Sequence, residues 1–152
     1  MSNNGISIIV PSGNAKGRAN YPHARLASLN SNVLYISGTG SRREDGTFDG
    51  VRHDVNGNLI LDIEQQTDAV LRNIEAVIKH ATNNKASLQN VIDATVFLTD
   101  IRAHYSGMNA VWNRVWPSYE QAPSRTTIGI KELPSPEMIV EIKCTAVVTI
   151  AD

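Results

Sequence analysis

An arginine and a glutamate in the last third of the sequence have side chains suited to chemistry on a small carboxylic acid. Arg125 follows Ala122-Pro123-Ser124 at the start of a strand-like segment, and Glu141 lies in the next such segment. A guanidinium can hold a carboxylate through two parallel hydrogen bonds, and a nearby glutamate can move a proton to or from water or nitrogen. The alternation of each strand predicts that both side chains leave the core on the same face. From the residues alone, a structural ion pair explains the two equally well.

Other chemistry finds less support in the residue types. No metal-site spacing connects the four histidines, which are His23, His53, His80 and His104. The small residues Ser37-Gly38-Thr39-Gly40-Ser41 lack the third glycine, and the helix directly after them, of a dinucleotide-binding loop. Cys144 lies among apolar residues at alternate positions and is predicted to be a buried packing residue. The sequence therefore predicts no metal site and no nucleotide-binding loop.

Length and composition fit one soluble domain spanning residues 1–152. The chain is 41% hydrophobic and 19% charged, and 14 Lys plus Arg against 15 Asp plus Glu leave a formal charge of -1. This balance gives no general field for nucleic acid or an anionic membrane, and we expect neither as a partner. A single cysteine favours a cytoplasmic protein. No segment approaches the roughly 18 apolar residues of a membrane span or resembles a signal peptide.

Two amphipathic helices are predicted from apolar residues that recur every three or four positions. The first runs from Asp62 to Ala81, where Asp62 and Gln65 resemble a capping box and Asn83-Asn84 is a plausible stop. The second runs from about Arg102 to Trp116, and Pro117 closes it. Its apolar face is rich in aromatic residues, and we interpret that face as core packing: Tyr105, Met108, Val111, Trp112, Val115 and Trp116.

Segments rich in Val, Ile and Thr predict four strands: Val33 to Ser37, Val91 to Thr99, Ser124 to Ile130 and Met138 to Ile150. Turn residues separate a short segment, Ala24 to Leu29, from the first of them and suggest a hairpin. The order of elements predicts an α+β two-layer sandwich, with a mixed sheet and both helices on one face. The segment from Thr39 to Asn58 is predicted to be irregular, and its length favours a functional or partner-contacting role.

The two faces of the predicted strands differ. Even positions from Met138 to Ile150 are all apolar, and the sets Ile92, Ala94, Val96, Leu98 and Ile128, Ile130 extend that face. The opposite face mixes Val91, Phe97, Ile139 and Val147 with charged residues and threonines. Because two helices cover one side of a sheet, we predict that the second face forms a subunit interface with a polar site. A solvated face with scattered apolar residues is the alternative.

An ordered set of motifs resembles the RidA/YjgF family of imine deaminases. The C-terminal part of the set is Ala122 to Thr127 (APSRTT), Leu133-Pro134 and Val140 to Lys143 (VEIK). Earlier parts are Ile36-Ser37-Gly38, Asp62 to Asn73 (DIEQQTDAVLRN), Val91 to Asp100 (VIDATVFLTD) and Asn109. The resemblance covers nearly the whole chain. It implies a chorismate-mutase-like fold, a homotrimer with active sites between subunits, and hydrolysis of a 2-imino or enamine acid to the 2-oxo acid and ammonia without metal or organic cofactor.

The resemblance also assigns roles to residues. Arg125 would bind the substrate carboxylate, and Glu141 would position and activate water. Asn109 and Tyr21 would line the cleft, and Ser37 would lie near its floor. Many members carry a cysteine two residues after the arginine, where this chain has Thr127. A thiol role is thereby excluded at that position, although the hydroxyl can still hydrogen-bond substrate or water.

Two segments resemble the 2-aminomuconate deaminase branch of the family: Ala19 to Arg25 (ANYPHAR) and Ser37 to Arg43 (SGTGSRR). 2-Aminomuconate is a dicarboxylate, so a dedicated site needs a second cation, for which Arg42, Arg43, Arg25 and His23 are the candidates. The arginines could instead solvate a loop or pair with Glu44 and Asp45.

Other functions within the family stay open. A general 2-imino acid deaminase and a non-catalytic ligand-binding or chaperone-like protein are alternatives to a dedicated enzyme. Translation inhibition or ribonuclease activity is disfavoured, because the sequence has no dense run of Lys and Arg.

Overall fold

A four-stranded mixed sheet forms the centre of the protein. The computed structural model describes residues 3–9, 19–28 and 30–149. The sheet has the strand order β3-β8-β6-β7, where the strands are β3 (Asn32–Thr39), β8 (Val140–Val148), β6 (Val91–Leu98) and β7 (Ser124–Gly129). β6 and β7 are parallel, and the other two pairings are antiparallel.

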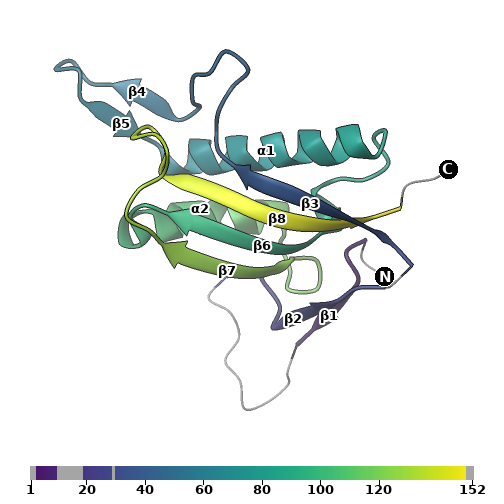
Figure 1. Ribbon diagram of the computed structural model, residues 1–152. Helices are drawn as coiled ribbons and strands as arrows, with labels where there is room; N and C mark the ends of the chain where they lie inside the picture. Colours follow the sequence, from purple (N-terminus) through teal and green to yellow (C-terminus); the bar gives the residue numbers. More distant parts are fainter. Residues whose placement is uncertain (1–2, 10–18, 29, 150–152) are drawn as a thin grey trace.

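Both helices pack on the same face of the sheet, as Figure 1 shows, and the predicted α+β sandwich is confirmed. α1 (Ile63–Ala81) begins where expected, with the Asp62 carboxylate accepting a 2.9 Å hydrogen bond from the backbone N–H of Gln65. Beyond its end, Asn83 and Asn84 adopt φ values of 49° and 63°, a conformation that asparagine tolerates after a helix. α2 (Ile101–Val115) is capped by Asp100. None of the helices in the described residues is long and apolar enough to cross a membrane.

The predicted core face of the last strand is confirmed. Its alternate residues from Val140 to Val148 are all buried against the helices. Cys144 is 2% exposed, and burial raises the pKa of its thiol to about 12. Met138 lies before β8, and Ile150 lies outside the described residues.

β6 departs from simple alternation at its first residues. The pairing with β8 shifts between Val91 and Asp93, so Val91 is buried and Ile92 is only half-buried. The prediction that Ile92 belongs to the core face and Val91 to the other was therefore wrong. A β-bulge adds one residue to a strand and reverses the faces before it, which alternation in the sequence does not reveal.

The first strands pair differently from the predicted hairpin. β2 (Ala24–Leu26) pairs with β1 (Ile6–Ile8), whereas β3 pairs with β8. Contacts distant in sequence hold this ribbon: the Ser7 hydroxyl donates to the Tyr119 carbonyl, and Arg25 Nε donates to the Ala122 carbonyl at 2.9 Å. Because these contacts are not local, nearby turn residues could not indicate the pairing.

The segment predicted to be irregular contains part of a second hairpin. β4 (Val51–His53) pairs with β5 (Leu59–Leu61), and the hairpin projects beyond the main sheet in Figure 1. The Asp54 carboxylate accepts hydrogen bonds from the backbone N–H groups of Asn56 and Asn58, which closes the turn. A 3₁₀ turn, η1 (Leu88–Asn90), precedes β6. Thr39 ends β3, and residues from 40 to 50 keep the predicted irregular form, with an isolated bridge between Arg42 and Phe48.

Candidate active site

Arg125 lies on the helix-covered face of the sheet. In the parallel pairing of β6 and β7, Arg125 is opposite Ala94 and Thr127 is opposite Val96, both of which are core residues. Arg125 is 8% exposed, whereas Ile128 is 41% exposed. The prediction that Ile128 faces the core and Arg125 faces away from it was therefore wrong. Alternation correctly separates two sets of side chains, but the composition of this edge strand did not indicate which set packs under α2.

Aromatic rings surround the Arg125 guanidinium. Its central carbon lies 4.7 Å from the ring centre of Trp112, 4.9 Å from that of Tyr21 and 5.9 Å from that of Tyr105. Nη1 also contacts the Met108 sulfur at 3.6 Å. Cation–π attraction to ring faces stabilises a guanidinium that has left water. We call these four side chains the aromatic cage.

No carboxylate of the described residues pairs with Arg125. Its Nε and Nη2 are buried and have no hydrogen-bond partner, and the same is true of the Asn109 side-chain oxygen and the Thr127 hydroxyl. Burial lowers the Arg125 pKa, and Tyr105 and Tyr21 act in the opposite direction. An unpaired buried cation is costly, so this arrangement suits a ligand that supplies the missing anion.

Asn20 fixes the position of Tyr21 over the guanidinium. Its carbonyl accepts from Trp112 Nε1 at 2.9 Å, its amide side chain donates to the Trp116 carbonyl at 2.9 Å, and its backbone N–H donates to the Asn113 side chain. The segment before β2 is thereby attached to α2. Neighbouring rings from two distant parts of the chain then enclose Arg125.

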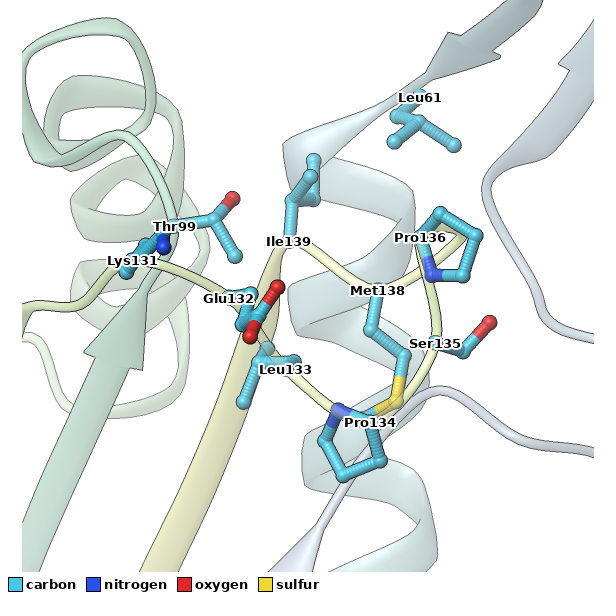
Figure 2. A pocket seen from close by; sticks show the side chains of 10 residues that line it. All are labelled: Leu61, Thr99, Lys131, Glu132, Leu133, Pro134, Ser135, Pro136, Met138 and Ile139. Carbon is cyan, nitrogen blue, oxygen red and sulfur yellow. The ribbon is translucent and has the colours of Figure 1, made fainter.

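A cavity of about 530 Å³ adjoins the cage and is lined by Tyr21, Ile101, Arg102, Tyr105 and Thr127. A larger cavity of about 810 Å³ lies at the turn before β8, where Figure 2 shows Met138 and two prolines around it. The larger cavity has exposed Lys131 and Glu132 on its wall and no buried unpaired polar group. We place the candidate site at the smaller cavity because Thr127, whose hydroxyl is unpaired, lines it together with Tyr21 and Tyr105 of the aromatic cage around Arg125.

Glu141 lies on the opposite, open face of the sheet. It is half-buried on β8 and pairs in register with Phe97, whose neighbours Val96 and Leu98 point into the core. A methyl group on Gly38 would collide with Oε1 of Glu141, so the carboxylate rests against the β3 backbone beside Ser37. Within one chain, the sheet therefore lies between the side chains of Glu141 and Arg125. The prediction that they share a face was wrong.

The remaining predicted cations have different surroundings. Arg25 donates to the backbone carbonyls of Gly5, Glu120 and Ala122, and burial lowers its pKa. His23 is exposed, and its backbone N–H donates to the Ile8 carbonyl at 3.1 Å. The structure therefore uses the Arg25 guanidinium to fasten the first ribbon.

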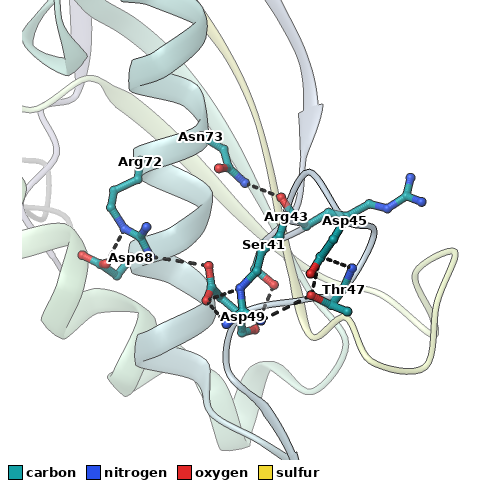
Figure 3. A network of polar contacts seen from close by, with 9 residues as sticks. Ser41, Arg43, Asp45, Thr47, Asp49, Asp68, Arg72 and Asn73 are labelled. Carbon is teal, nitrogen blue, oxygen red and sulfur yellow. Dashed lines mark hydrogen bonds and ion pairs between the residues drawn. The ribbon is translucent and has the colours of Figure 1, made fainter.

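Arg43 belongs to a network that fixes the loop after β3, shown in Figure 3. Its Nε donates to the Asp49 carboxylate at 2.9 Å, and Arg72 of α1 lies 3.6 Å from the other oxygen of Asp49. The Asp45 carboxylate accepts from the backbone and hydroxyl of Thr47 instead of pairing with an arginine. Arg42 is exposed, and its Nε makes a long 3.4 Å hydrogen bond to the Gly46 carbonyl.

Comparison with known proteins identifies the family. The family model described as Endoribonuclease L-PSP matches residues 14–148. The RutC family protein YoaB of Escherichia coli K12 is 37% identical over 120 residues, which are 79% of this chain and 86% of that protein. The chain belongs to the RidA/YjgF family. A RutC family protein of Aquifex aeolicus is 26% identical over 87 residues, which are 57% of this chain and 66% of that protein.

A solved RidA/YjgF fold agrees with the architecture. The structure of YyfB from Yersinia pestis, a protein of the Rid family, matches with a TM-score of 0.74 and 23% identity. The match covers 95% of this chain and 99% of that one.

In this RidA/YjgF chain, Tyr105, Met108 and Trp112 were predicted only as core residues of the second helix. Their spacing on one helix face was visible in the sequence, but the arginine beneath them was not.

Proposed function

We propose that the protein hydrolyses 2-imino and enamine carboxylic acids to 2-oxo acids and ammonia. The observation that carries the proposal is the buried guanidinium of Arg125, which lies in an aromatic cage without a carboxylate partner. A substrate carboxylate would complete its hydrogen bonds. The unpaired oxygens of Asn109 and Thr127 would accept hydrogen bonds from the nitrogen of the substrate or from water.

A second copy of the chain would complete the site. The open face carries exposed apolar side chains, with Tyr35 76% exposed, Val33 52% and Ile128 41%. A homotrimer would cover this face and place Glu141 of one copy against the Arg125 cavity of the next. Arg125 and Glu141 lie on opposite faces of the sheet in one chain. This supports the arrangement, because a heterologous contact joins different surfaces of two copies.

The chemistry then needs one anchor and one proton-transfer group. Arg125 fixes the carboxylate beside the imine carbon, and an enamine first takes a proton at carbon and releases one from nitrogen to become the imine. As water attacks that carbon, Glu141 accepts a proton from the water and returns it to nitrogen. A second proton then moves from the carbinolamine hydroxyl to nitrogen, and ammonia leaves to give the 2-oxo acid. The reaction consumes one water and transfers no electrons, and orientation of water and substrate supplies much of the rate.

The narrower substrate that we propose is 2-aminomuconate. The resemblance of residues 19–25 and 37–43 to that branch of the family supports it. The second carboxylate of this substrate requires another cation besides Arg125. An endoribonuclease, which the family description names, must bind RNA, and the net charge of -1 does not favour RNA binding.

Ammonia release tests the activity directly. An amino-acid oxidase generates 2-iminobutyrate in situ, and the protein is expected to accelerate its hydrolysis. Glu141→Gln retains shape without the proton-transfer group and should lower kcat by about 100-fold or more. A wild-type protein that leaves imine hydrolysis at its spontaneous rate would contradict the proposal.

A further inference from the structure

The cavity beside the aromatic cage contains a second arginine that the sequence did not single out. Arg102 lines this cavity together with Tyr21, Tyr105 and Thr127. It is exposed, and its side chain forms no ion pair with any residue in the described ranges. The nearby Asp100 carboxylate is occupied by the backbone N–H groups of Arg102 and Ala103, at 3.1 and 3.0 Å. No acidic residue is among those that line the cavity.

The two cations occupy different depths of one site. Arg125 is 8% exposed behind Tyr21 and Tyr105, whereas Arg102 stands at the cavity wall in contact with solvent. Arg102, Tyr105 and Asn109 are spaced by three and four residues and therefore share one face of α2. The helix rises by about 10 Å between Asn109 and Arg102. A ligand that meets both arginines therefore needs one anionic group for each of them.

We propose that Arg102 determines specificity by binding a second carboxylate at the far end of the substrate. The inference rests on the proposed function, since Arg125 is taken to hold the carboxylate next to the reacting carbon. It differs from the sequence prediction, which sought the second cation in Arg42, Arg43, Arg25 or His23. Two of those side chains are engaged elsewhere, Arg25 by backbone carbonyls and Arg43 by Asp49.

A pair of ligands that differ only in the second carboxylate tests the proposal. 2-Oxoadipate and 2-oxohexanoate have six carbons each, and only the first has a carboxylate at both ends. Calorimetric titration measures their affinities for the intact protein. Arg102→Gln removes the charge and should weaken 2-oxoadipate by about tenfold or more, while 2-oxohexanoate changes less than about twofold. Arg102→Lys keeps the charge and should restore most of the preference.

Matched controls separate charge near the cavity from charge elsewhere. Arg114 lies on the same helix and forms an exposed 3.4 Å ion pair with Glu64, so Arg114→Gln should leave the ratio of the two affinities unchanged. The proposal is overturned if Arg102→Gln leaves that ratio unchanged, if it weakens both ligands equally, or if Arg42→Gln removes the preference instead.

The same variants separate this inference from the proposed activity. The imines of 2-aminoadipate and norleucine, formed by an amino-acid oxidase, are the corresponding substrates. Dicarboxylate selectivity in binding without any ammonia release would overturn the proposed deaminase and support Arg102 as a binding residue. Ammonia release from both imines at equal kcat/KM, unaltered by Arg102→Gln, would overturn the role of Arg102 and support the deaminase.

Discussion

The Arg125 side chain is a cation held out of water by rings and a thioether. Burial of an unpaired charge is unfavourable, and cation–π contacts of about 0.5 to 2 kcal/mol each offset only part of that cost. Its Nε and Nη2 atoms have no hydrogen-bond partner, so two directed N–H donors remain free for a ligand. A carboxylate that enters the cavity gains both the charge and the planar hydrogen-bonding edge of the guanidinium.

Truncation of this side chain should remove the anchor. Arg125→Ala is expected to lower kcat/KM for imino acids by roughly 10 to 150-fold, which corresponds to about 1.5 to 3 kcal/mol for a charged hydrogen bond. Arg125→Lys should rescue only partly because an ammonium lacks the planar fork. Steady-state ammonia release measures both variants, and full activity in Arg125→Ala would show that the arginine does not bind substrate.

Cys144 should behave as a packing residue. The folded protein raises its pKa to about 12, so the thiol remains neutral at physiological pH and its buried environment disfavours the thiolate. Burial of the neutral thiol favours the folded state fully below the ordinary thiol pKa. The free energy of unfolding falls as pH rises from that value toward 12, because the unfolded chain releases the thiol proton more readily. Cys144→Ser should lower the free energy of unfolding by about 1 to 3 kcal/mol, because a buried hydroxyl replaces a weakly polar thiol.

Denaturant unfolding and ammonia release distinguish the two possible roles of the cysteine. The folded Cys144→Ser protein should keep its turnover per assembled site. A well-folded variant with lost turnover would contradict the packing interpretation.

Strand β3 positions Glu141 through the absence of a side chain. Gly38 has no strained backbone, but a methyl group at this position would collide with the Glu141 carboxylate. The constraint is therefore space, and it acts between neighbouring strands on the open face. The bulge between Ile36 and Thr39 falls at the same point of β3 and changes its register with β8.

Gly38→Ala should displace the Glu141 carboxylate. Misplacement of a catalytic group by about 1 Å can cost 100-fold, and we expect kcat to fall by about 10 to 100-fold. Gly40→Ala is the matched control because its methyl group meets the flexible end of Met138. If kcat falls equally in both variants, the effect comes from the strand and not from Glu141.

At the scale of the whole molecule, the sheet has one covered face and one open face. Helices α1 and α2 cover the first, and Figure 1 shows no element over the second among the described residues. Exposed Tyr35 and Val33 lie there on β3, as Glu141 does on β8. The proposed trimer would both bury this apolar surface and bring the catalytic carboxylate to the arginine cavity.

Mixing two impaired variants tests this assembly. Arg125→Ala and Glu141→Ala are each expected to keep at most about a tenth of the wild-type activity alone. After denaturation and refolding together, about a quarter of the sites should combine an intact arginine with an intact glutamate from different copies. Ammonia release should return to a corresponding fraction of the wild-type rate.

Light scattering supplies the second measurement for the assembly. A wild-type trimer at micromolar concentration is expected. A stable monomer, or mixed variants that stay inactive although they assemble, would contradict sites shared between copies.

The sequence by itself determined the features that depend on neighbours along the chain. Asp62 and the two asparagines after α1 mark the helix ends through the chemistry of single residues. The apolar stripes of both helices and the buried face of β8 follow from periods of 3.6 and 2 residues. These signals are local, so they led to the right fold class and to a buried Cys144. The family motifs also predicted four site residues, namely Arg125, Glu141, Asn109 and Tyr21.

Tertiary structure decided which surfaces those residues share. The period of a strand separates its two faces, but it does not say which face of β7 packs under α2. That choice depends on Tyr21, Tyr105 and Trp112, which reach Arg125 from distant segments. The bulge in β6, the pairing of β2 with β1 and the place of Arg102 at the same cavity likewise depend on contacts between distant parts of the chain. Local patterns carry no information about such partners, and only the folded chain brings them together.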